Sequence, residues 1–325
     1  MGQKGNLMTF RPDIKVVDAT IRDGGLVNNF FFTDEFVKEL YEANIKSGVD
    51  YMEFGYKASK DLFDVKEFGK WKFCDEEDIR SIVGDNLSDM KIAVMADVGR
   101  TDFEKDIIDK KDSVIDLIRI ATYINTIPAA IEMIEYCHAK GYETSVNIMA
   151  VSTADSKDIE QALELLGQSN VDVIYLVDSY GSLYPEQIRN LTEMYVAVAE
   201  KYGKKAGIHA HNNQQMAFAN TIEATTNGAS YLDATMMGMG RGAGNCVLEG
   251  LLGFLKNPKY RLVYALRFVE TYMLELKKKG LVWGYDVPYL LTGLFNQHPR
   301  SAIDKMKNND TAYAKFYTEL WDREH

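Results

Sequence analysis

Two histidines separated by one residue are the most specific chemical signal in this sequence of 325 residues. His209 and His211 end an apolar run over residues 206–211. Side chains two positions apart on a strand point to the same side, so both imidazoles can reach one ion. Asp23 at the end of the first apolar run and Asn245 after a glycine-rich loop complete a mixed nitrogen and oxygen ligand set. Such a set suits Mn²⁺, Mg²⁺ or Zn²⁺.

Arg22 directly precedes Asp23 and adds a second chemical element. A guanidinium beside a divalent cation can hold a carboxylate or stabilise a developing enolate oxygen. Because one carboxylate does not neutralise a divalent ion, such a site would attract an anionic substrate. Two plainer interpretations stay open: the histidines only line a strand end, and Arg22 only pairs with Asp18 or Glu53 to brace the fold.

Eight short apolar runs provide the elements that would position these residues. Most are four to eight residues long and nearly continuous in apolar character, which is typical of strands buried on both faces of a parallel sheet. Their mean spacing of about 31 residues matches ~250 residues divided among the eight units of a (β/α)₈ barrel. The expected strands are Lys15–Thr20, Val49–Gly55, Lys91–Asp97, Leu117–Thr122, Thr144–Ala150, Val173–Asp178, Ala206–His211 and Tyr231–Gly238.

Helical patterns fill the gaps between these runs. Thr33 opens one helix that Gly48 closes, and Pro128 and Pro185 mark the starts of two others. The alternation predicts an α/β fold, a (β/α)₈ TIM barrel over residues 12–257, with a doubly wound open sheet as the alternative.

Residues 258–325 are expected to form a helical C-terminal extension. Lys259–Lys279 has an amphipathic helical pattern, and Trp283–Asn308 combines turns with helical segments. No low-complexity linker precedes them, so we expect the extension to pack on the barrel. It could support oligomerisation, act as a lid or cover apolar surface.

Composition excludes several classes of function. The chain has 48 acidic and 37 basic residues and a formal net charge of −11, which argues against general nucleic-acid binding. Three separated cysteines give no disulfide framework. The first ten residues lack the apolar core of a signal peptide, and no apolar run reaches 18 residues. These features predict a cytoplasmic protein that does not bind membranes.

In a closed barrel the first, seventh and eighth strands are neighbours, and active sites lie at the carboxyl ends of the strands. Asp23, His209, His211 and Asn245 would therefore converge. The loop Gly238–Asn245 would let its backbone approach a ligand. It is a poor dinucleotide site, because no strand ending in Asp or Glu follows about 20 residues later.

Three segments, in this order, resemble the DRE-TIM metallolyase superfamily, which includes 4-hydroxy-2-oxovalerate aldolase, hydroxymethylglutaryl-CoA lyase and isopropylmalate synthase: Asp18–Gly25, His209–Asn213 and Gly238–Asn245. The resemblance covers the whole barrel. It implies carbon–carbon bond chemistry through a metal-bound enolate, with Arg22 near the substrate oxygen. The metal ligands it implies are Asp23, His209, His211 and, in some members, Asn245.

One departure from the superfamily concerns the proton carrier. The hydroxy-oxovalerate aldolases carry a base histidine two residues after the Arg–Asp–Gly triplet, and Leu26 stands at that position here. His298 and Tyr289 of the extension are candidate replacements, and Tyr56 and Asp97 at strand ends are further options. Alternatively, His298 only caps a helix and Tyr289 only packs on the barrel.

The sequence therefore predicts a carbon–carbon lyase of the aldolase type that uses one divalent metal, a 2-oxo acid such as pyruvate and an aldehyde. A Claisen-condensing acyltransferase of the isopropylmalate or citramalate synthase type is the alternative enzyme. A non-catalytic metal-binding barrel is the alternative outside enzymes. The aldehyde, the metal, a homo-oligomer and a dehydrogenase partner stay open. The candidate substrate-binding residues are Arg22, Glu53, Asp178, Gly240 and Gly242.

Overall fold

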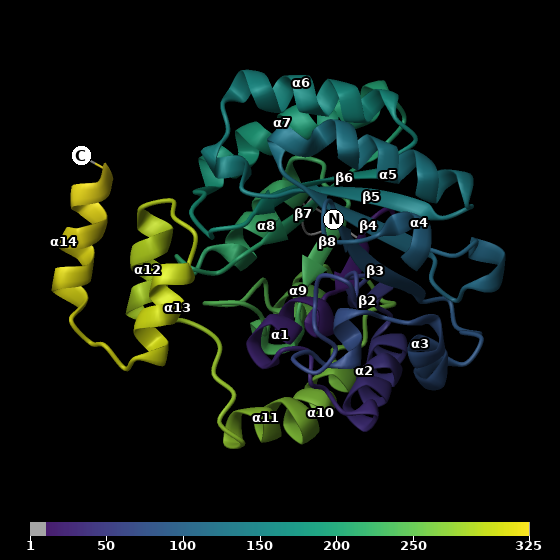
Figure 1. Ribbon diagram of the computed structural model, residues 1–325, viewed down its shortest axis with the longest axis horizontal. Coiled ribbons are helices and arrows are strands. Elements are labelled where there is room, and N and C mark those ends of the chain that lie inside the picture. The colour runs from purple at the N-terminus through teal and green to yellow at the C-terminus, as the bar shows by residue number, and fades with distance from the viewer. Residues whose placement is uncertain (1–10, 325) are drawn as a thin grey trace, which may run out of the picture.

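Eight parallel strands close into a barrel in the computed structural model, which describes residues 11–324 (Figure 1). Each strand pairs with the next in sequence, and the first pairs with the last. This confirms the predicted TIM barrel and excludes the open sheet. The first ten residues, where we expect no signal peptide, lie outside the described part. The strands are β1 (Lys15–Asp18), β2 (Tyr51–Tyr56), β3 (Lys91–Asp97), β4 (Leu117–Thr122), β5 (Glu143–Ile148), β6 (Val173–Asp178), β7 (Lys205–Ala210) and β8 (Tyr231–Ala234).

The strands are apolar because helices cover the barrel on its outside and side chains fill its inside. Every residue of β2, β4, β6 and β8 is buried. Arg119 on β4 and Asp233 on β8 are charged residues within these apolar strands, and both are fully or almost fully buried. The barrel interior therefore holds charge as well as apolar packing.

The helices of the barrel begin and end near the predicted signals. The Thr33 hydroxyl accepts a hydrogen bond from the backbone N–H of Phe36, and Gly48 ends the same helix with a φ of 79°. Pro185 begins another helix. These helices are α1 (Thr20–Asn28), α2 (Asp34–Ser47), α3 (Glu76–Val83), α4 (Phe103–Asp106), α5 (Ile127–Ala139), α6 (Ser156–Gln168), α7 (Pro185–Lys201), α8 (Ala217–Thr226) and α9 (Leu248–Phe254).

The first and last strands are shorter than predicted. β1 stops at Asp18, whose carboxylate accepts a hydrogen bond from the backbone N–H of Thr20 at 3.1 Å and so favours the turn into α1. The expectation that Asp23 ends the first strand is therefore wrong, because Asp23 lies in the first turn of α1. β8 ends at Ala234, and the short 3₁₀ helix η6 (Met236–Gly238) follows.

The predicted amphipathic helix of the extension is interrupted by a π-helical turn. That turn, η7 (Val269–Met273), separates α10 (Leu262–Phe268) from α11 (Leu274–Lys278). Beyond it lie α12 (Val287–Leu294), α13 (Arg300–Lys307) and α14 (Tyr313–Glu324), the last of which the sequence did not predict. Figure 1 shows α12, α13 and α14 side by side at one edge of the molecule.

Asn296 is one of the residues that join this helical group to the loops of the barrel. Asn296 donates to the carbonyl of Ser152 at 2.9 Å and accepts from the hydroxyl of Ser182 at 2.7 Å. The extension therefore reaches the end of the barrel where the strands terminate. Within residues 11–324, no helix has the length and apolar character needed to cross a membrane.

Candidate metal centre

Asp23, His209 and His211 come together at the carboxyl end of the barrel. One potential ligand atom from each lies within 4.8 Å of the others, and all three side chains are buried. The Nε2 atoms of His209 and His211 lie 3.4 Å and 3.9 Å from Asp23 Oδ2. Two of these side chains come from β7 and the residue after it, and the third from the first turn of α1. The structure thus places three of the predicted ligands together.

Two buried atoms without a hydrogen bond to any residue within 11–324 support a cation at this point. His209 Nε2 and Asn245 Oδ1 make no hydrogen bond to another described residue, although buried polar atoms are nearly always paired. Asn245 Nδ2 donates to the Met239 carbonyl at 3.1 Å, which holds the side chain in place. A Cβ on Gly240 would lie 2.1 Å from Asn245 Nδ2 and 2.6 Å from Asp23 Oδ1. Gly240 is needed so that the backbone can pass this close.

The protonation states of Asp23 and His211 fit metal binding. Burial opposes the charge on Asp23, but Arg22 and the two histidines hold the pKa of this carboxyl well below its usual value. Burial lowers the pKa of His211 well below its usual value, so this imidazole is neutral. A carboxylate and a neutral imidazole are the forms that ligate metals. Burial opposes a charge on His209, but Asp23 and Asp233 raise its pKa, so a metal ion would compete with a proton there.

His209 is oriented by a carboxylate on its other side. Its Nδ1 lies 3.0 Å from Asp233 Oδ2, which also accepts from Arg119 Nη2 at 2.6 Å. A proton on Nδ1 leaves the lone pair of Nε2 facing Asp23. We did not single out Asp233 or Arg119 from the sequence, although a charged residue inside an apolar strand was an available signal.

Arg22 links the ligand group to this buried network. Its Nε donates to Glu53 at 2.8 Å and its Nη1 to Asp23 at 2.5 Å, whereas Nη2 has no hydrogen-bond partner. Glu53 also accepts from Arg119 at 2.8 Å. Three buried carboxylates, from Asp23, Glu53 and Asp233, thus face two guanidiniums. The surplus negative charge favours a cation, since buried charges need compensation.

A small cavity opens beside the ligand group, with a volume of about 70 Å³. This is well below the ~300–1,000 Å³ of sites for drug-sized ligands, so it suits a ligand of few atoms. Its apolar side includes Leu26, which confirms that no histidine stands at the usual base position. The lining residues are Arg22, Asp23, Leu26, Tyr56, Met95, Ala121, Asn147, Met149, Val177, Ser179, His209, His211 and Arg241.

Several predicted site residues lie behind the cavity wall instead of lining it. Glu53 is fully buried and pairs with arginines, as in the plainer interpretation of Arg22. Asp178 accepts from the backbone N–H groups of Ser182 and Leu183 at 3.0 Å and 3.4 Å, and burial raises its pKa to about 7. Asp97 is partly exposed and lies outside the lining, whereas Tyr56 lines the cavity.

The candidate proton carriers of the extension contact the glycine loop. His298 Nε2 lies 3.3 Å from Arg241 Nη1. A Cβ on Gly242 would lie 3.5 Å from the Tyr289 ring, so Gly242 packs against the extension. Neither His298 nor Tyr289 lines the cavity. Arg241, which sequence reasoning passed over, stands between them and the ligand group.

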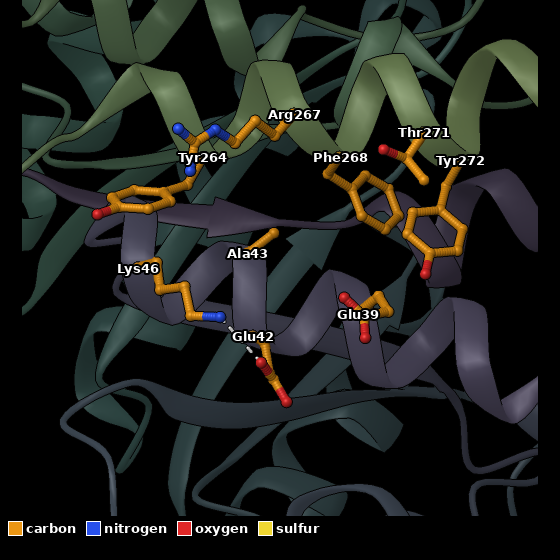
Figure 2. Close-up of a pocket in the computed structure, with 9 residues that line it drawn as sticks. All are labelled: Glu39, Glu42, Ala43, Lys46, Tyr264, Arg267, Phe268, Thr271 and Tyr272. Carbon is orange, nitrogen blue, oxygen red and sulfur yellow. Dashed lines mark hydrogen bonds and ion pairs between the residues drawn. The ribbon is translucent and has the colours of Figure 1, made fainter.

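A larger groove of about 430 Å³ lies on the outside of the barrel, between α2 and the helices α10 and η7 (Figure 2). In it Lys46 pairs with Glu42 at 2.9 Å, and Tyr264, Phe268 and Tyr272 supply aromatic surface. No group with metal-ligand geometry lines this groove among the described residues. The candidate metal-ligand group lies at the carboxyl end of the barrel and not in this groove.

A closed (β/α)₈ barrel with an Asp–His–His group beside an arginine at its carboxyl end has the layout of a DRE-TIM lyase or aldolase, enzymes that use a divalent metal. A protein-family model described as HMGL-like matches residues 13–271, and the chain belongs to this family.

Relatives with assigned activities are similar over most of the chain. Oxaloacetate decarboxylase of Mycobacterium tuberculosis is 30% identical over 245 residues, 74% of this chain and 69% of the relative. 4-Hydroxy-2-oxovalerate aldolase of Pelotomaculum thermopropionicum is 29% identical over 255 residues, 77% of this chain and 72% of the relative.

Solved structures share the fold. The N-terminal domain of a candidate aldolase from Bacteroides vulgatus superposes with a TM-score of 0.77 at 27% identity, covering 90% of this chain and 96% of the other. Hydroxymethylglutaryl-CoA lyase of Pseudomonas aeruginosa has a TM-score of 0.65 at 14% identity, with 91% and 99% covered, and this likeness shows the fold alone.

Proposed function

We propose that this protein is a divalent-metal-dependent carbon–carbon lyase that releases the enolate of a 2-oxo acid such as pyruvate. The observation that carries the proposal is the convergence of Asp23, His209 and His211 beside Arg22. Within residues 11–324, the Nε2 atom of His209 makes no hydrogen bond. Asn245 is the proposed fourth ligand. A Mn²⁺, Mg²⁺ or Zn²⁺ ion held there would act as a Lewis acid on the carbonyl and carboxylate oxygens of the substrate.

Arg22 and Tyr56 supply the remaining chemistry inside the cavity. Arg22 Nη2 makes no hydrogen bond within residues 11–324 and lies 4.0 Å from Asp233 Oδ2, so it can stabilise the oxygen that gains charge as the carbon–carbon bond breaks. Tyr56 lines the cavity, and burial raises the pKa of its hydroxyl well above the usual value. A phenol that stays protonated is suited to donate a proton to the enolate carbon.

Aldol cleavage is the first candidate reaction. It requires a base that takes the proton of the substrate hydroxyl, after which the carbon–carbon bond breaks and an aldehyde leaves. Leu26 occupies the position of the usual base, and the titratable groups of the cavity are the ligands, Arg22, Arg241 and Tyr56. His298 or Tyr289 would have to act as this base from the other side of the glycine loop Gly238–Asn245.

Decarboxylation is the second candidate, and the missing base favours it. In a 2-oxo acid with a carboxylate on C3, the bond from C3 to that carboxylate breaks, carbon dioxide leaves, and the electron pair forms the enolate. C3 then takes a proton, which Tyr56 can donate. No base is required. The relative named oxaloacetate decarboxylase, at 30% identity, also supports this reaction.

Deuterium exchange at the methyl group of pyruvate tests the shared enolate step. We expect NMR to show exchange with Mg²⁺, none after chelation, and none in His209→Ala. His138→Ala, which removes an exposed histidine on α5, is the matched control and keeps the exchange. Absence of exchange in metal-loaded protein would refute the proposal, and would point to an acyl-CoA donor or a non-catalytic barrel. Product analysis then separates aldehyde release from carbon dioxide release.

A further inference from the structure

We infer that Arg241 binds a second carboxylate of the substrate, so that the 2-oxo acid accepted here is a short dicarboxylate. This inference rests on the proposed function and names the substrate class for the same cavity.

Arg241 is held at the ligand group by its own backbone. Its N–H donates to Asp23 Oδ1 at 3.0 Å, and Arg241 lines the cavity together with Arg22, His209 and His211. Its guanidinium donates to the carbonyl of Ser179, another lining residue. A cavity of about 70 Å³ brings its guanidinium within reach of the same small molecule that contacts Arg22. The chain supplies two arginines to one small space.

Unlike the guanidiniums of the other arginines of the site, the Arg241 guanidinium pairs with no carboxylate within residues 11–324. Arg22 and Arg119 each form ion pairs with two carboxylates at 2.5–2.8 Å. Within residues 11–324, Arg241 Nη2 donates only to the Ser179 carbonyl at 3.1 Å, and its buried Nε has no partner. An arginine fork is suited to bidentate binding of a carboxylate.

The contact with His298 does not provide an acceptor for all hydrogen-bond donors of the Arg241 guanidinium. His298 Nε2 lies 3.3 Å from Arg241 Nη1, and His298 Nδ1 accepts from the backbone N–H of Arg300 at 3.1 Å. Burial and the two arginines lower the pKa of His298 to about 4, so the ring is neutral. A neutral imidazole has one acceptor nitrogen, so it accepts from one of these two donors only. With Nδ1 engaged, the Arg241 guanidinium keeps free donors.

The charge of the site matches a dianion. The three carboxylates and two guanidiniums of the interior leave one negative charge, and a divalent ion changes this to one positive charge. Arg241 adds a second positive charge. A monocarboxylate would neutralise half of this excess, and a dicarboxylate would neutralise all of it. The cavity volume limits the chain between the two carboxylates to few carbons.

Lactate and malate provide a matched pair of probes. Both are stable 2-hydroxy acids that offer a hydroxyl and a carboxylate to a metal, and malate adds one carboxylate. In calorimetric titrations of the Mg²⁺-loaded protein we expect malate to bind about 10- to 100-fold more tightly than lactate, the range for a hydrogen-bonded charged group. We expect Arg241→Gln to lower malate affinity much more than lactate affinity and so to abolish this preference. Arg241→Lys should restore part of it. Arg267→Gln, on the outer groove of Figure 2, is the matched control and keeps the full preference.

Each outcome decides the inference. Equal affinities for malate and lactate in the unaltered protein would overturn it, whether or not a variant folds. Retention of the malate preference in a folded Arg241→Gln protein would also overturn it. These titrations are independent of turnover. Pyruvate exchange without a malate preference would refute only the role of Arg241, and a malate preference without exchange would refute only the proposed reaction.

Discussion

Asp233→Asn removes one charge from the centre of the buried network while keeping the shape of the side chain. In the unaltered protein, Asp233 Oδ2 accepts from His209 Nδ1 at 3.0 Å and from Arg119 Nη2 at 2.6 Å. An amide at this position holds the His209 tautomer less firmly and leaves Arg119 with Glu53 as its one remaining ion-pair partner. The substitution therefore affects both metal binding and the stability of the barrel.

The two effects have different expected sizes. Loss of the group that orients a metal-binding histidine lowers metal affinity by about 10- to 100-fold. Breaking a buried ion pair costs about 3–5 kcal/mol of unfolding free energy. An unfolding entropy of about 2.1 cal/mol/K per residue gives ~0.7 kcal/mol/K for this chain. Division gives a decrease in Tm of about 4–7 °C for the metal-free protein.

Calorimetric titration of chelator-treated protein with Mn²⁺ measures the first effect, and thermal unfolding without metal measures the second. Asp89→Asn, on an exposed aspartate without an ion-pair partner within the described residues, is the matched control and should change neither quantity. A folded Asp233→Asn protein that binds Mn²⁺ as tightly as the unaltered protein would refute the claim that Asp233 orients His209. An unchanged Tm would refute the stabilising role of the network.

Three further predictions concern separate parts of the site. Gly240→Ala would place a Cβ 2.1 Å from Asn245 Nδ2, so we expect Mn²⁺ affinity in calorimetry to fall by about tenfold or more; unchanged affinity would contradict the tight packing. Asp178 has a folded pKa of about 7, above its unfolded value, so its contribution to stability falls as pH rises from about 4 to 7. Urea unfolding of Asp178→Asn should lack this fall, and a profile parallel to that of the unaltered protein would argue against it. Leu26→His would add a base to the cavity, so we expect aldehyde release from 4-hydroxy-2-oxo acids to rise by about 100-fold; a rate equal to that of the unaltered protein would place the missing base elsewhere.

The barrel could be predicted from the sequence because both faces of its strands are buried, and buried strands consist mostly of apolar residues. The end of β1 could not be predicted in this way. Arg22 and Asp23 lie in a helix that contains two glycines, which local propensity disfavours. Gly25 is required there because a Cβ would lie 2.1 Å from the Phe30 ring, a contact that depends on the folded chain. Packing decided the conformation of this segment.

The predicted ligand group could be recognised because His209 and His211 carry their spacing in the sequence. The network behind them could not be assembled in this way, since Arg119 and Asp233 are 114 positions apart. Arg241 went unnoticed because flanking glycines indicate a loop and say nothing about where its side chain points. Contacts between residues far apart in the chain cannot be predicted from a single sequence.

The chain of ion pairs through Arg22, Glu53, Arg119 and Asp233 also constrains how this protein can change over generations. Replacement of any one member removes at least one buried ion pair from its neighbours, so changes at these positions are coupled. Leu26 and Arg241 have no such charged partners within the described residues, and each can be replaced by a single codon change. We therefore expect related proteins to keep the candidate metal centre and its ion-pair network together. Substrate specificity can change through single substitutions at the cavity wall.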